Sequence, residues 1–150
     1  IENLLKINML GTHMAKMDQN EIEQFLKQPY IAHLTVLDES NNPFPVPIWF
    51  KYEDGNLWLI SNIKSKKIQH IEKNPNVSLS IANSARPYQY VIFNGIAEIS
   101  DPADSNKIIQ VCTKYDGEIE GKKFAQLLME SRHTIIINIK ITKTNAWIDR

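Results

Sequence analysis

The sequence predicts an α+β fold that is mainly β, with six antiparallel strands in a small Greek-key barrel and several short helices. Apolar residues form short runs rich in isoleucine and valine, or alternate with small polar residues, and both patterns are typical of strands. Most runs are joined by short segments of turn-forming residues, so neighbouring strands are expected to be antiparallel. A chain of 150 residues most simply forms one such domain.

We place this domain at residues 14–150. The preceding residues 1–13 are interpreted as an expression-tag leader, because "GTHM", from Gly11 to Met14, resembles a cloning junction. No functional role is assigned to the leader.

Composition and charge exclude several classes of partner. Lysine plus arginine and aspartate plus glutamate number 17 each, so the formal net charge is zero and no broad basic surface serves nucleic acid. No apolar run approaches the ~20 residues of a membrane-spanning helix, and no secretory signal is visible. We therefore expect a cytoplasmic protein that binds neither nucleic acid nor membrane. The single cysteine, Cys112, excludes an internal disulfide and a cysteine-rich metal site, and is expected to be buried on a helix.

The first expected element is a helix over residues 18–28. Asp18 can cap it, Glu21 stands where a capping box prefers glutamate, and Pro29 ends it. The remaining elements follow from the same patterns of apolar residues and turns. Strands are expected at residues 31–37, 44–52, 57–61, 77–82, 89–100 and 133–141, and helices at residues 65–73, 102–115 and 122–131.

Prolines and glycines refine this outline. Pro45 and Pro47 lack the N–H group that a central strand needs, so the second strand is expected at an edge, where a ligand could lie against backbone. Gly95, in the middle of a strand, suggests a bulge or a close approach of another backbone. Asp101 and Pro102 suit the start of a helix, and the two glycines of "DGEIEG" indicate a loop after it.

Hydrogen-bond donors are concentrated after the third expected strand. The stretch "SNIKSKKIQHIEKNP", residues 61–75, places two serines and three lysines within seven residues at the start of a helix. Lys66 and Lys67 lie in the first turn, where free N–H groups and the positive end of the helix dipole also lie. Ser61 and Ser65 add hydroxyl groups. This set of donors suits a phosphate monoester, and a solvated, lysine-rich helix start explains the same residues equally well.

The same segment resembles one in the pyridoxamine 5'-phosphate oxidase-like flavoproteins. The stretch "WLISNIKSKKIQHIEKNPNVSLSI" is similar to a family segment in which one strand ends, the chain binds the FMN phosphate, and a helix and a further strand follow. Upstream, "PFPVPIWFKYEDGNLWL" is similar to the family's early strands and "DG" hairpin. Downstream, "VIFNGIAEISD" and "IKITKTNAW" are similar to its later strands. The resemblance covers about residues 31–147.

The resemblance implies an FMN-binding split β-barrel that forms a homodimer with two flavins at the subunit interface. It implies that Ser61, Lys66 and Lys67 contact the FMN phosphate, with Asn62 and Ser65 beside them.

The implied ring-binding positions lie earlier in the chain. The strand backbone at Val46, Pro47, Ile48 and Trp49 is expected to face the isoalloxazine ring. Lys51, at the end of that strand, matches a basic residue that some relatives place near the flavin or the substrate.

Two positions on later strands complete the implied set. Tyr90 falls where the oxidases carry a flavin-contacting glutamine, and Trp147 would lie over the site. Packing is an equal alternative for Trp49 and Trp147. Trp58 is expected in the core, and His70 is expected to be structural or exposed rather than catalytic.

The resemblance implies an FMN-dependent oxidoreductase with an unassigned small-molecule substrate, in which the flavin carries the redox chemistry. A true pyridoxamine phosphate oxidase is not expected, because the three arginines cannot supply the arginine-rich segment that grips the substrate phosphate there. Three alternatives stay open: a deazaflavin-dependent reductase on the same fold, a haem-degrading relative, and a non-catalytic flavin-binding or stress-related protein. No catalytic residue is assigned.

Overall fold

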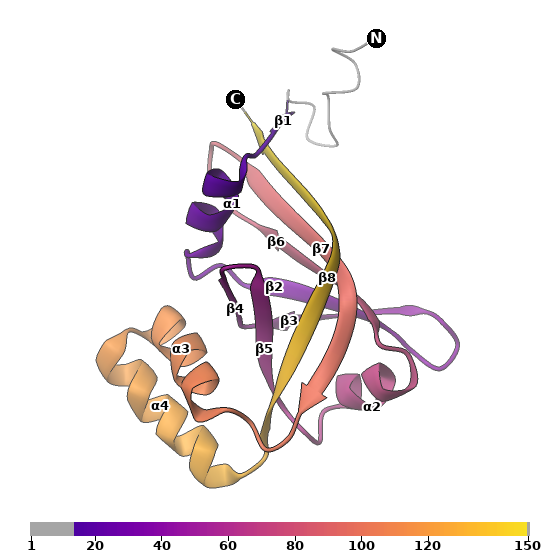
Figure 1. Cartoon of the computed structure of the whole chain (residues 1–150), viewed down its shortest axis with the longest axis vertical. Coiled ribbons are helices and arrows are strands. Elements are labelled where there is room, and N and C mark those ends of the chain that lie inside the picture. Colours follow the sequence, from indigo (N-terminus) through magenta and orange to yellow (C-terminus); the bar gives the residue numbers. More distant parts are fainter. Residues whose placement is uncertain (1–13, 150) are drawn as a thin grey trace.

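In the described residues, eight strands form one strongly curved antiparallel sheet with four helices packed around it (Figure 1). The computed structural model describes residues 14–149, so the expected leader at residues 1–13 lies outside the described residues. The strands are β1 (Met14–Lys16), β2 (Ala32–Leu37), β3 (Pro43–Ile48), β4 (Phe50–Glu53), β5 (Asn56–Asn62), β6 (Asn76–Ala82), β7 (Gln89–Ser100) and β8 (Thr134–Asp149). The helices are α1 (Gln19–Leu26), α2 (Lys66–Lys73), α3 (Ser105–Asp116) and α4 (Glu118–Ser131).

The strand order explains how the barrel closes. From one edge of the sheet to the other the order is β3-β2-β6-β7-β8-β5-β4, with β1 added to β8. The two edge strands, β3 and β4, are consecutive in the chain and are separated only by Trp49. Two peptide steps span at most ~7 Å, so the two edges of the curved sheet must meet at Trp49. This arrangement confirms the predicted mainly β, split-barrel fold class.

The described sheet has two strands more than the six expected, for two reasons. The expected strand over residues 44–52 is broken at Trp49 into β3 and β4, and β3 lies at an edge, as its prolines predicted. The short strand β1 pairs with the end of β8. The prediction that the last strand ends at Ile141 was wrong, because β8 continues to pair with β7 as far as Ile148.

Gly95 confirms the expectation of a bulge and a close backbone approach. The pairing of β7 with β8 shifts register between Asn94 and Gly95. A Cβ atom at Gly95 would lie 2.5 Å from the backbone oxygen of Lys140 and 2.6 Å from a side-chain carbon of Ile139. Only glycine therefore fits this position without a backbone shift.

The helix boundaries differ from expectation at two places. α1 has the predicted capping box between Asp18 and Glu21. The cap of α3 is Asp104 rather than Asp101, because the Asp104 side chain accepts a hydrogen bond of 2.9 Å from the N–H group two residues later. The loop expected over "DGEIEG" is wrong: α4 follows α3 after Gly117 alone, whose φ of +84° allows the abrupt reversal.

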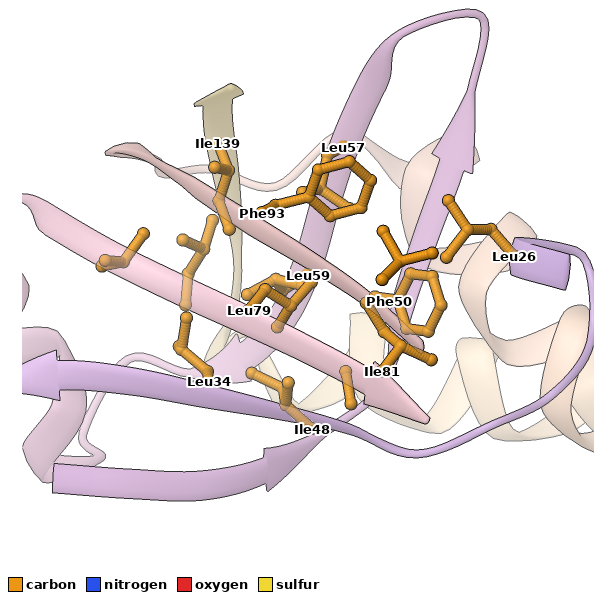
Figure 2. Close-up of a cluster of buried hydrophobic side chains, with 14 of the residues drawn as sticks. Leu26, Leu34, Ile48, Phe50, Leu57, Leu59, Leu79, Ile81, Phe93 and Ile139 are labelled. Carbon is orange, nitrogen blue, oxygen red and sulfur yellow. The ribbon is translucent and has the colours of Figure 1, made fainter. Parts of the chain in front are cut away.

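Two cores hold these elements together. Figure 2 shows side chains from several strands pointing toward one another inside the barrel, with Phe50 and Leu59 fully buried among them. A smaller core lies between the sheet and the α3–α4 pair and includes Trp58, Cys112 and Ile136. Trp58 and Cys112 are thus buried as expected, and burial raises the pKa of the Cys112 thiol to about 11.

Neither a membrane span nor a metal site is found in the part of the chain that the structure describes. None of its helices combines the length and the apolar character needed to cross a bilayer. Its His, Cys, Asp and Glu side chains form no group of three or more that could hold a metal ion.

Candidate functional site

A pocket of about 620 Å³ is lined by residues from the end of β5, from α2 and from α4. In Figure 1 these parts of the chain lie at the same end of the molecule. Its volume is within the ~300–1,000 Å³ typical of small-molecule sites. The pocket joins segments that are far apart in the sequence: the junction of β3 and β4, the end of β5 and the start of α2. Half of the predicted site residues line it, namely Pro47, Ile48, Trp49, Ser61, Asn62 and Lys67.

One end of the pocket carries hydroxyl groups and the start of a helix. Ser61 is 8% exposed, and its Oγ lies 3.2 Å from Oγ of Ser65. Ser65 is the N-cap of α2, but its side chain makes no capping hydrogen bond, so no side chain caps the first-turn N–H groups. Asn62 tightens the turn by accepting a hydrogen bond of 2.8 Å from the Lys64 N–H. Donors and the positive end of the helix dipole therefore meet at this end.

Lys67 gives the same end a positive charge that is only partly solvated. The residue is half-buried, lines the pocket, and pairs with no carboxylate in residues 14–149. Burial lowers the pKa of its ammonium group. A half-buried cation without a counter-ion is costly, and an anion in the pocket would relieve that cost. Lys66, by contrast, is exposed and does not line the pocket.

The other end of the pocket is aromatic and apolar. Pro47 and Ile48 end the edge strand β3, which pairs only with β2 in the described sheet. The Trp49 ring stacks on Tyr115 of α3, with centroids 4.6 Å apart and planes 6° apart. Its edge meets Phe124 of α4, with centroids 5.8 Å apart. Trp49 thus packs on the helices and also forms a wall of the pocket. This aromatic wall, together with the positive charge of Lys67, suits a ligand that has a flat ring and an anionic group.

The remaining predicted residues lie outside this pocket. Val46 packs against the main core and Lys51 lies on β4. Ser65 does not line the pocket, but its hydroxyl lies within hydrogen-bond distance of the Ser61 hydroxyl, which does. Tyr90 and Trp147 face each other across β7 and β8. The start of β7 and the end of β8 lie at the opposite end of the sheet from α2 and α4 (Figure 1).

Residues that the sequence analysis missed form much of the pocket's apolar wall. The expected helix over residues 122–131 was given no functional role, although Phe124 and Leu128 of α4 line the pocket. Their apolar spacing along a helix was the available indication, but it did not show which cavity they face. The missed lining residues are Ile31, Ile60, Phe124, Leu128, Ser131 and Thr134.

The structure thus defines a split barrel with a pocket that is charged at one end and aromatic at the other. Residues 19–147 match the family model described as pyridoxamine 5'-phosphate oxidase, so the chain belongs to this family. No curated protein matches the sequence.

Several solved structures share the fold. A conserved hypothetical protein, Rv2991 from Mycobacterium tuberculosis, is 24% identical with a TM-score of 0.78, covering 89% of this chain and 86% of that chain. An F420 reductase is 23% identical with a TM-score of 0.66, covering 81% of this chain and 94% of that chain. An FAD-binding protein from Mesorhizobium loti is 17% identical with a TM-score of 0.63, covering 92% of this chain and 98% of that chain.

Proposed function

We propose that this protein binds FMN in the pocket and acts as an FMN-dependent oxidoreductase on a small molecule. The observation that carries the proposal is Lys67, a half-buried cation that lines the pocket and has no carboxylate partner in the described chain. Membership of the family, and the fold shared with an F420 reductase and an FAD-binding protein, support a flavin-type ligand.

The residues present fit the two ends of FMN. The Lys67 ammonium, the Ser61 hydroxyl and the backbone N–H groups of Lys66 and Lys67 would hold the phosphate monoester, because all are donors near the start of α2. Pro47, Ile48 and Trp49 would hold the isoalloxazine ring at the other end. When bound, FMN supplies the hydride or electron transfer. The chain's own residues then orient the ring and keep water from it.

The homodimer remains part of this proposal. Ile31 and Phe124 line the pocket although they are 44% and 38% exposed, so they present apolar surface at its mouth. A second subunit, together with a bound flavin, would cover this surface. A cytoplasmic location and a small-molecule substrate complete the proposal.

A deazaflavin such as F420 is the second candidate ligand. The F420 reductase that shares the fold supports it, and the aromatic end of the pocket suits either ring system. The terminal phosphate monoester of FMN matches the group of donors at the start of α2 more closely, so FMN is the ligand we favour.

Titration of the ligand-free protein with FMN, riboflavin, FAD and F420 tests the choice of ligand. FMN is expected to bind most tightly, and riboflavin, which has the same ring without phosphate, more weakly. Anaerobic reduction of the FMN-bound protein by NADH or NADPH, followed by reoxidation with candidate acceptors, tests turnover. Tighter binding of F420 would favour the deazaflavin reductase, and FMN binding without any reduction would favour a non-catalytic flavin-binding protein.

A further inference from the structure

Two side chains of α3 hold the junction between β3 and β4. Trp49 interrupts the chain's strand there, and Phe50 begins β4 at the edge of the sheet. We propose that Lys114 and Tyr115 are positioning residues, which fix the Trp49 wall of the pocket and so set its affinity for the flavin ring. This inference rests on the flavin-binding function proposed above.

Three contacts of Tyr115 converge on this wall. Its hydroxyl donates a hydrogen bond of 2.8 Å to the Tyr30 carbonyl and accepts one of 3.2 Å from the Phe50 N–H. Its ring stacks on Trp49. Tyr30 directly precedes Ile31, which lines the pocket together with Trp49. One side chain of α3 therefore ties together two parts of the pocket wall that lie on separate segments.

Lys114 holds the other backbone group of Phe50. Its Nζ donates a hydrogen bond of 3.0 Å to the Phe50 carbonyl and lies 3.4 Å from the centroid of the Phe50 ring. The N–H and C=O groups of one strand residue point to the same side, so both groups of Phe50 face α3 rather than β5. Burial, with a smaller contribution from the charge of Lys51, lowers the pKa of Lys114 to about 7, and both forms of the amine donate this hydrogen bond.

These contacts close the barrel where no strand pairing does. The described pairings include none between β3 and β4, although the two edges meet at Trp49. Loosening Lys114 or Tyr115 would therefore move Trp49 without unpairing a strand. Such a change should alter ligand affinity more than the stability of the sheet, and this difference separates positioning from a purely structural role.

Tyr115→Phe and Lys114→Met test the inference, with Lys107→Met as the matched control. Lys107 is also a half-buried lysine of α3, but it bonds Asn138 at 2.7 Å and does not line the pocket. Each test variant is expected to bind both FMN and riboflavin about tenfold more weakly, because Tyr115→Phe removes two hydrogen bonds at the junction and Lys114→Met removes one. The ratio of the two affinities should stay constant, because the phosphate end is unchanged. The control should bind both flavins as the wild type does.

Amide hydrogen exchange provides a second measurement that needs no flavin. The Phe50 amide, which donates to Tyr115, should exchange faster in Tyr115→Phe and not in Lys107→Met. Unchanged flavin affinity in both test variants, or an equal loss in the control, overturns the inference. If the wild type binds no flavin, the proposed function fails. In that case, faster exchange of the Phe50 amide in Tyr115→Phe would still support the claim that Tyr115 positions the β3–β4 junction, and unchanged exchange would overturn it.

Discussion

Replacing Lys67 with alanine is expected to weaken FMN binding by about 1.5–3 kcal/mol, or roughly 10- to 150-fold in Kd. This is the range for a hydrogen bond to a charged group, and burial strengthens the attraction of the Lys67 ammonium for a phosphate. The substitution leaves no carboxylate unpaired within the described chain, so the loss reports the contact itself. Lys66 is exposed and lies outside the pocket, so replacing it as well should add little.

Calorimetric titration with FMN and with riboflavin measures this contact directly. Riboflavin has the same ring without the phosphate, so its affinity should be the same in wild type and Lys67→Ala. Lys73→Ala is the matched control on the same helix, because Lys73 pairs with Glu39 outside this pocket and both side chains are exposed. This control should bind FMN as the wild type does.

Two results would refute the reasoning about Lys67. Unchanged FMN affinity in Lys67→Ala would show that the phosphate does not lie beside this lysine. An equal loss for FMN and riboflavin would show that the substitution changes the shape of the pocket rather than a contact with the phosphate.

Three further outcomes follow from the fold and the site. Gly95→Ala should lower the free energy of unfolding by about 1–3 kcal/mol, because the new Cβ meets backbone of Lys140 at 2.5 Å; an unchanged midpoint in urea would contradict this. Lys114 has its pKa lowered from 10.5 to about 7, so between these values the unfolded chain binds the extra proton and stability rises with pH. The free energy of unfolding in urea should therefore rise less between pH 7 and pH 9 in Lys114→Met than in the wild type. Equal rises in the two proteins would refute the lowered pKa of Lys114. The wild type should sediment as a dimer at micromolar concentration, and the double variant Ile31→Ser/Phe124→Ser should sediment as a monomer. A monomeric wild type would contradict the proposal that a second subunit covers the mouth of the pocket.

The sequence predicted those parts of the fold that local patterns determine. Strand alternation, the capping box of α1 and the glycine that marks the bulge in β7 are each visible in a short stretch of sequence, and the structure has all three features. Beside the break at Trp49, the backbone of Phe50 bonds Tyr115 and Lys114, which are more than sixty residues away in the chain. No local pattern could show these contacts.

The same distinction applies to the pocket. Its charged end was predictable because Ser61 and Lys67 lie on one strand, turn and helix start, within a few residues of one another. Its helical wall was not, because Phe124 reaches the pocket only through the packing of α4 beside Trp49. Tyr90 and Trp147 lie at the other end of the sheet in one chain, so a role for them at the flavin would require the second subunit.

Titration of the ligand-free wild-type protein with FMN and with riboflavin tests most directly whether the start of α2 binds a phosphorylated flavin. The account predicts one FMN per chain, bound at least about tenfold more tightly than riboflavin, as one charge-assisted contact to phosphate requires. Equal affinities for the two flavins, or no binding of either, would contradict it.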